Sequence, residues 1–268
     1  MANLIRSAKS SSDWTLNELD SYNIHLERRE ALESFWSSDP AVDPELFQYL
    51  EADDMQQARN AELINLLDLA MLRSSGESAV DDFVVELLRH TGYVHRNRVA
   101  CTRKDLPLLI CGEWRHAKTD VCIVDRRQND ILLLVQEDKY LEDREPLDAH
   151  AQLVVEALAA FAESNAGRES FDLPPFESKA SIPIPLTVSI MPGIVMAGTA
   201  PTFPKIPVTQ ELMNHVRYGM YPPTPTVVTY CFPPLPHPLR RRSDGMKPFN
   251  NRSQILSCYE AFKTVVGI

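Results

Sequence analysis

The chain has 268 residues, of which 44% are apolar and 24% are charged, and its formal net charge is −10 at pH 7. This composition is that of a folded globular protein, so it excludes wholesale disorder. The acidic balance counts against a structural nucleic-acid coat, which needs a basic surface. It is compatible with an enzyme whose basic groups are confined to one cleft.

The first part of the chain predicts helices. Apolar residues recur at helical spacing up to Leu72, which indicates an acidic helical extension over residues 1–73. Such an extension could hold a protein partner or a second copy of the chain. Met1 to Ser12 contain no apolar signal region, and no apolar run reaches the roughly 20 residues of a membrane span. We therefore expect a soluble, intracellular protein that does not enter a membrane.

Residues 74–268 predict one α/β domain. An apolar stripe over Glu77–His90 is typical of a core-facing helix, which Gly92 ends. Two strand signals, over residues 119–125 and 131–136, flank turn-forming residues and predict the clearest hairpin in the chain. The other expected elements are a strand over 93–100, a helix over 148–164, a Pro-rich loop over 172–185, strands near 186–190, 193–198 and 205–208, a helix near 209–216, a strand near 224–230 and a closing helix over 253–266.

The open end of this hairpin collects polar residues. If the turn is centred on Gln128-Asn129, Asp120 faces Glu137 across the strands, and Lys139 lies on the same face two residues later. Two carboxylates this close would repel each other, and a divalent cation such as Mg²⁺ removes the repulsion. The pattern therefore predicts a metal site in which the amine of Lys139 assists the attack of water on a phosphodiester.

A basic stretch runs directly into this site. Between Arg89 and Lys118 there are seven Lys or Arg residues against two acidic residues. The stretch is either a solvated face or the wall of a nucleic-acid cleft, and in the second case Arg115, His116 and Lys118 are the expected substrate contacts.

The order of these motifs resembles the PD-(D/E)xK nuclease superfamily. A helix with an early Glu is followed by a strand, a hairpin with Asp120 and then, after sixteen residues, Glu137-Asp138-Lys139, and a second helix. The resemblance implies a restriction-endonuclease-like mixed β-sheet flanked by helices, with Mg²⁺-dependent (or Mn²⁺-dependent) hydrolysis of DNA or RNA. Residues 115–122 and 132–139 also resemble segments of uncharacterised fungal proteins.

The resemblance also implies roles for individual residues. Asp120, Glu137 and Glu77 would be metal ligands, Lys139 the catalytic lysine, and Gln152 a polar residue beside the substrate. Thr119 stands where many members of the superfamily have Pro, and Asp138 is expected to point to the opposite face of the strand.

Several alternatives stay open from the sequence. Glu86 and Asp81 are rivals of Glu77 on the same helix, and Asp120 and Lys139 could instead form a structural ion pair. The domain could also be a catalytically inactive binding or interaction module that keeps the fold.

The remaining motifs are weaker candidates, and a phosphate-binding or nuclear-import patch at Arg240–Arg242 is the less favoured alternative. Five cysteines without metal-ligand spacing are expected to be reduced and at least half-buried, and Arg240–Arg242 are expected to form a solvated loop.

Overall fold

The structure, a computed structural model, describes residues 6–29, 39–72, 77–138, 147–175 and 188–268. Its strands are β1 (Ile24–Arg28), β2 (Arg98–Thr102), β3 (Asp105–Ile110), β4 (Glu113–Lys118), β5 (Val121–Asp125), β6 (Asp130–Glu137), β7 (Val188–Ala197), β8 (Ala200–Thr209) and β9 (Thr226–Cys231). Its α-helices are α1 (Leu16–Ser21), α2 (Ala58–Met71), α3 (Glu77–His90), α4 (Leu147–Ser170), α5 (Gln210–Tyr218), α6 (Arg241–Asp244) and α7 (Phe249–Val266). Short 3₁₀ helices are η1 (Ser11–Asp13), η3 (Pro44–Phe47), η4 (Ala52–Asp54) and η5 (Pro238–Arg240).

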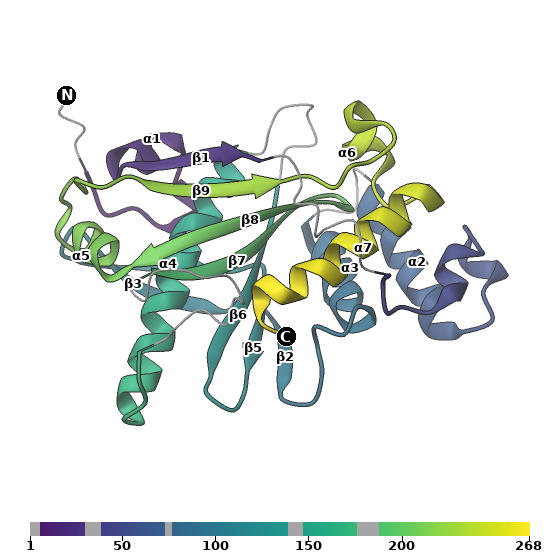
Figure 1. Ribbon diagram of the computed structural model, residues 1–268, viewed down its shortest axis with the longest axis horizontal. Coiled ribbons are helices and arrows are strands. Elements are labelled where there is room, and N and C mark those ends of the chain that lie inside the picture. The colour runs from purple at the N-terminus through teal and green to yellow at the C-terminus, as the bar shows by residue number, and fades with distance from the viewer. Residues whose placement is uncertain (1–5, 30–38, 73–76, 139–146, 176–187) are drawn as a thin grey trace.

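Seven of these strands form one mixed sheet in the order β1-β9-β8-β7-β6-β5-β2 (Figure 1). β2, β5 and β6 are antiparallel neighbours, and β7 then runs parallel to β6. Since parallel neighbours need a long crossover, helix α4 connects β6 to β7. β3 and β4 form a separate two-stranded sheet between β2 and β5 in the sequence.

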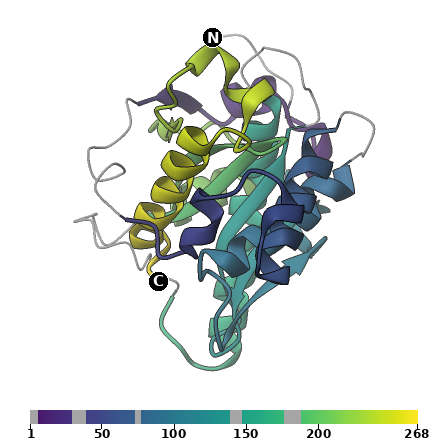
Figure 2. The ribbon, with the colours of Figure 1, turned by 90° about the vertical axis from the view of Figure 1, so that its right-hand side faces the viewer.

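Helices cover both faces of the sheet (Figures 1 and 2), and each face has its own hydrophobic core. On one face α2, α3 and α7 pack against side chains such as Val121, Ile123 and Val135. On the other face α4 packs against Cys122 and Leu134. The side chains of β5 alternate between the two cores, as strand geometry requires, whereas the adjacent Leu132 and Leu133 of β6 both belong to the first core, because the pairing with β5 shifts by one residue there.

Helix α4 is buried on almost all sides. The sheet lies against one side of it, and β3, β4 and α1 lie against others. Its residues are accordingly apolar around most of the helix, with Leu153, Val154, Ala157 and Leu158 at 1% exposure or less. A polar residue that is buried on this helix therefore needs an explanation.

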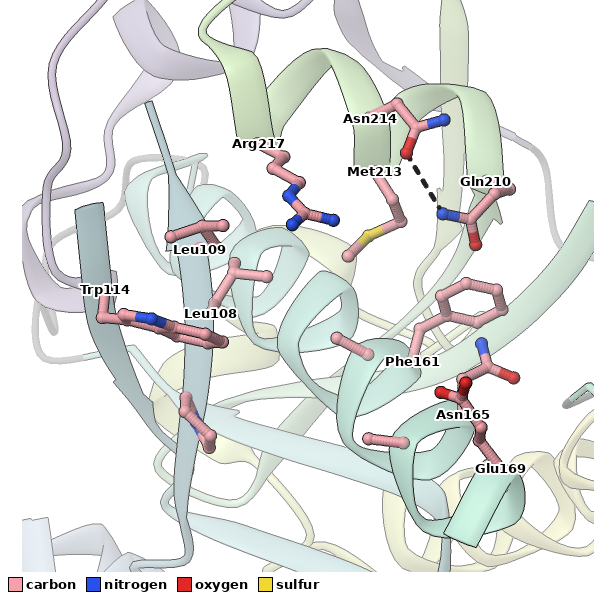
Figure 3. A pocket seen from close by; sticks show the side chains of 13 residues that line it. Leu108, Leu109, Trp114, Phe161, Asn165, Glu169, Gln210, Met213, Asn214 and Arg217 are labelled. Atoms are coloured by element: carbon pink, nitrogen blue, oxygen red, sulfur yellow. Dashed lines mark hydrogen bonds between the residues drawn. The ribbon is translucent and has the colours of Figure 1, made fainter. Parts of the chain in front are cut away.

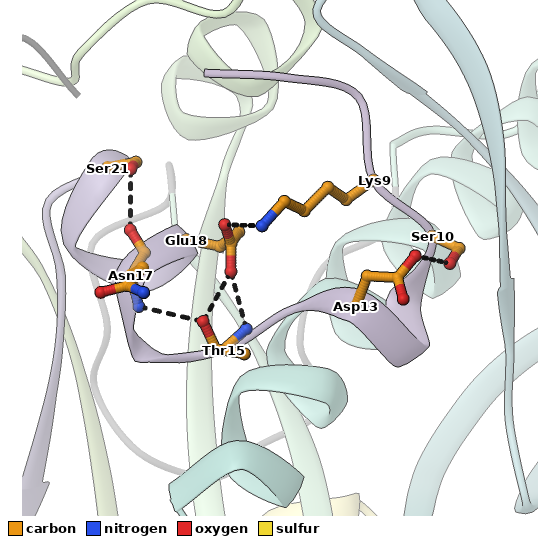
Figure 4. Close-up of polar contacts among 7 residues, drawn as sticks. All are labelled: Lys9, Ser10, Asp13, Thr15, Asn17, Glu18 and Ser21. Carbon is orange, nitrogen blue, oxygen red and sulfur yellow. Dashed lines mark hydrogen bonds and ion pairs between the residues drawn. The ribbon is translucent and has the colours of Figure 1, made fainter. Parts of the chain in front are cut away.

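The N-terminal part differs from the expected helical extension. α2 is a helix, but Ile24–Arg28 form strand β1, which pairs in parallel with β9 at the sheet edge. Before it, Thr15 and Glu18 form a capping box at the start of α1, and Glu18 also pairs with Lys9 (Figure 4). Residues 16–28 are therefore part of the α/β sheet and its covering layer. Their strand was missed because it is short and lies at an edge.

The expected α/β class with a mixed sheet flanked by helices is confirmed, and most predicted elements are present. The predicted strands near 186–190 and 193–198 form one strand, β7, from residue 188 onward, while residues 186–187 lie outside the described part. All five cysteines are free, and Cys101 and Cys111 are half-buried while the others are buried. Within the described ranges, no helix combines the length and the apolar character that crossing a membrane requires.

Candidate functional site

The hairpin that carries the candidate site is present, but its register differs from the prediction. Val121 is paired with Val135, whereas the predicted register would have paired Val121 with Gln136. The turn is centred one residue earlier than expected, because Asp125 pairs with Asp130, and an irregularity between Ile123 and Val124 shifts the pairing by one residue. A bulge of this kind cannot be derived from strand propensity, since it inserts one residue without changing the apolar pattern.

The observed register places Asp120 one position past the last pair of β5, on the α4 side with Cys122. Asp120 nevertheless reaches Glu137, because its Oδ2 accepts a hydrogen bond of 2.8 Å from the Glu137 backbone N–H. Because side chains alternate along a strand, the Glu137 side chain belongs to the opposite face of β6, and Glu137 is the last residue of that strand. The two residues are therefore neighbours, but the prediction that their carboxylates face each other directly is wrong. Instead, the Asp120 carboxylate is bound by the backbone N–H of Glu137.

A second carboxyl group stands beside Asp120 that the sequence analysis did not identify. Glu156 on α4 is 1% exposed, and no group in the described part of the chain donates a hydrogen bond to its Oε2. Burial raises the pKa of Glu156 well above its ordinary value, and the nearby charge of Asp120 raises it further. The signal in the sequence was a Glu inside an otherwise apolar helical stretch, Leu153–Phe161.

Gln152 lies one helical turn before Glu156 and connects three segments. Its Oε1 accepts from Gln136 Nε2, and its Nε2 donates to the Ser12 carbonyl, both at 3.3 Å. Gln136 is 3% exposed, and within the described residues nothing donates to its Oε1. Asp120, Gln136, Gln152 and Glu156 therefore form a polar group on the α4 face, at the open end of the hairpin.

The residues expected to contact substrate lie on β4. Arg115 is half-buried and donates from Nε to the Ala8 carbonyl at 3.0 Å, so it holds the N-terminal segment in place. His116 is exposed and lies 2.9 Å from Asp105, its neighbour on β3. The Lys118 side chain is exposed at the end of β4, two residues before Asp120.

Asp138, the variable position of the motif, is a structural residue. It is 5% exposed, its backbone N–H donates to the Met196 carbonyl, and its carboxylate pairs with Arg242 at 2.8 Å. Arg242 is itself 8% exposed, so the expected solvated loop over Arg240–Arg242 is wrong for this residue. The partner lies 104 residues away, which is why no local pattern indicated it.

The rest of the expected metal site is only partly visible. Lys139 lies outside the described residues, as does the side chain of Glu77, although the backbone of Glu77 begins α3 as predicted. Its rival Glu86 is bound by Arg59, Arg89 and His90 on the far part of that helix, which assigns it a structural role. Asp81, the other rival, is half-buried on α3.

The side-chain oxygens of this polar group are of the kind that binds a hard divalent cation, but they are too few to form a complete metal site. No described residue donates to the buried Gln136 Oε1 or Glu156 Oε2, and Asp120 adds a carboxylate next to Glu156. Mg²⁺ and Mn²⁺ prefer such oxygens. Among the side chains that the structure describes, however, no three His, Cys, Asp or Glu residues gather as a metal-binding group. A complete site would need a further ligand, and Glu77 is the candidate from the sequence.

No protein-family model matches the chain, and no curated protein matches it significantly.

Proposed function

We propose that this chain is a Mg²⁺-dependent nuclease with a restriction-endonuclease-like core. The observation that carries the proposal is the polar group at the open end of the β5–β6 hairpin, where Asp120 is held by the Glu137 N–H beside the buried carboxyl of Glu156. A buried acid next to a second carboxylate is costly unless a cation or a proton neutralises the pair.

The order of elements supports the same proposal. Helix α3, strand β2, the acid-bearing hairpin β5–β6 and helix α4 occur in the order that the resemblance to the PD-(D/E)xK superfamily implies, with the β3–β4 hairpin inserted between β2 and β5. α4 then leads into β7, which is parallel to β6, so the acids lie at the end of a central strand rather than at a sheet edge. Asp120 and Glu137 are half-buried, so this strand end remains accessible from solvent.

In this proposal Asp120 and Glu156 would hold the cation from the α4 face, with Glu77 as a further ligand and Lys139 beside the scissile phosphate, whereas the Glu137 side chain belongs to the other face of β6. When bound, the cation supplies Lewis-acid polarisation of a phosphodiester oxygen and activation of water. The Glu137 N–H orients the Asp120 carboxylate. The hydrogen bond between Gln152 and Gln136 holds α4 against β6 at the site. Lys118 provides positive charge for the substrate backbone.

The test is cleavage of end-labelled DNA and RNA, single-stranded and duplex, with Mg²⁺ or Mn²⁺. We expect the wild type to cut at least one of these and Asp120→Asn to lose cleavage. The stability of Asp120→Asn should change by no more than about 1 kcal/mol, because the amide oxygen can still accept from Glu137. The matched control is Asp20→Asn, which alters an exposed Asp on α1 and should cut like the wild type. Equal cleavage by wild type and Asp120→Asn overturns the proposal.

A second candidate is a binding module that keeps the fold without cleaving. The observation that favours it is that no three ligating side chains gather within the described ranges. In that case the chain binds nucleic acid or a protein partner, and neither Mg²⁺ nor Mn²⁺ produces any cleavage or any thermal shift.

A further inference from the structure

A groove lies beside the β3–β4 hairpin, where that hairpin meets α4 and α5. Its volume is ≈ 330 Å³. The residues that line it include Leu109 and Trp114 from the hairpin, Phe161 from α4, and Gln210, Asn214 and Arg217 from α5. Apolar side chains form its floor and polar side chains its rim, which is the character of a small-molecule or base-binding site.

The outer wall of the groove is an exposed aromatic ring. Trp114 is 67% exposed, although large aromatic side chains are usually mostly buried. It pairs across the strands with Leu109, and in Figure 3 the indole stands at the hairpin side of the groove. A large apolar surface held open to solvent on a strand offers a stacking platform.

The opposite rim is a polar stripe on one face of α5. Gln210, Asn214 and Arg217 are all exposed and are spaced by four and three residues, so they lie on the same side of the helix (Figure 3). Gln210 Nε2 donates to Asn214 Oδ1 at 3.3 Å, which orients both amides. This bond leaves Gln210 Oε1 and Asn214 Nδ2 as an acceptor and a donor at the rim, next to the guanidinium of Arg217. Such groups match the hydrogen-bonding edge of a nucleobase.

The two rims are fixed relative to each other. At the tip of the hairpin, the backbone N–H groups of Cys111 and Gly112 donate to the carbonyls of Val216 and Arg217 at 3.0 and 2.8 Å. These carbonyls lie at the C-terminal end of α5, where carbonyl groups run out of partners within the helix; that of Val216 also accepts from the N–H of the C-cap residue Gly219. At the other end of α5 the Thr209 hydroxyl caps the helix by accepting from Leu212 N–H. Hydrogen bonds within the fold therefore hold the two rims in place, which lowers the entropic cost of binding.

Strand β4 leads from this groove to the proposed nuclease site. Trp114, His116 and Lys118 alternate along the strand and are all exposed, so they share its outer face. At about 3.4 Å per residue the face extends for about 14 Å, with Trp114 at the groove and Lys118 two residues from Asp120. The positive charge of Lys118 at the end of this face can bind a phosphate of a nucleic-acid backbone.

We propose that the groove binds an unpaired base stacked on Trp114, so that the substrate of the proposed nuclease is single-stranded nucleic acid. The inference rests on the proposed function. A duplex keeps the faces of its bases stacked inside, whereas a single strand can turn one base onto an indole. The strand then continues past His116 and Lys118 to the acids at the hairpin end.

The test measures binding without cleavage. A fluorescently labelled oligothymidylate of about 12 nucleotides is titrated with the protein in EDTA, and anisotropy is recorded. We expect Trp114→Ala to weaken binding about 5- to 150-fold, the loss of one stacked base, and Trp114→Phe to weaken it less. Leu239→Ala, which removes a 96% exposed side chain on η5, is the control and should bind like the wild type. A duplex of the same length should bind more weakly and should not respond to Trp114→Ala.

Thermal melting of both Trp114 variants verifies that they are folded, which the exposure of this side chain favours. Equal affinity of wild type and Trp114→Ala, or tighter binding of the duplex, overturns the inference. Binding that depends on Trp114 without any cleavage by the wild type leaves the inference standing and overturns the nuclease proposal. Cleavage that depends on Asp120 but not on Trp114 supports the nuclease proposal and overturns the inference about the groove.

Discussion

The attachment of the hairpin to helix α4 gives the most definite stability prediction. Asp130, at the start of β6, is 0% exposed, and its two oxygens accept from Arg168 Nε at 2.9 Å and Nη2 at 2.7 Å. Replacing Arg168 with Met deprives a fully buried carboxylate of this bidentate partner. Removing one member of a buried pair costs about 3–5 kcal/mol, so we expect the free energy of unfolding of Arg168→Met to fall by about that amount.

The assay is urea unfolding followed by circular dichroism, with the slope of the free energy against urea checked for constancy. The double variant Asp130→Leu/Arg168→Met should recover most of the loss, because it removes the buried charge as well. Arg240→Met is the matched control. Arg240 is 68% exposed in its ion pair with Asp244, so this change should cost about 1 kcal/mol or less. A loss below about 1 kcal/mol for Arg168→Met, or a double variant less stable than the single one, would refute the assignment.

Three further predictions concern single side chains. Because the pKa of Glu156 is raised, the folded state keeps this proton where the unfolded state loses it, so the stability of the wild type declines as the pH rises above 4.5, the ordinary pKa. In metal-free thermal melts, Glu156→Gln should therefore gain stability relative to the wild type as the pH rises over this range. Equal pH profiles of the two proteins would contradict this. A Cβ at Gly245, where φ is +49°, would meet Thr199 Oγ1 at 2.0 Å, so Gly245→Ala should cost about 1–3 kcal/mol or more in urea unfolding, and a neutral result would contradict the placement of α6. Thr209→Ala removes the cap on α5 and should cost about 1 kcal/mol, whereas Thr209→Ser should cost less.

Elements with a strong apolar period were predictable from the sequence. The helix expected over Glu77–His90 has those bounds in the structure, and both strands of the hairpin lie within two residues of their predicted limits. These elements contact large cores, so their side chains follow the geometry of one helix face or one strand face. β3 was missed because Pro107 interrupts its apolar pattern, and β4 was missed because Ala117 is its one buried residue.

The candidate site was predictable only in part, because its contacts are not local. Asp120 and Gln152 were found from the motif, and the structure places both on the α4 face of the hairpin. The register depends on a bulge that no pattern indicates, and the role of Glu156 depends on the second layer that covers α4. Likewise, the burial of Asp138 follows from Arg242 far along the chain. From sequence alone a charged residue is predicted to be exposed, because its burial depends on a partner that the local pattern does not reveal.

The central claim is that the carboxylates at the open end of the β5–β6 hairpin share one divalent cation. Calorimetric titration of the metal-free protein with Mn²⁺ tests it most directly, using wild type, Asp120→Asn, Glu156→Gln and the control Asp20→Asn. The proposal predicts one binding event in the wild type and the control that is lost or strongly weakened in the other two variants. Absence of Mn²⁺ binding in the wild type, or unchanged binding in Asp120→Asn, would contradict it.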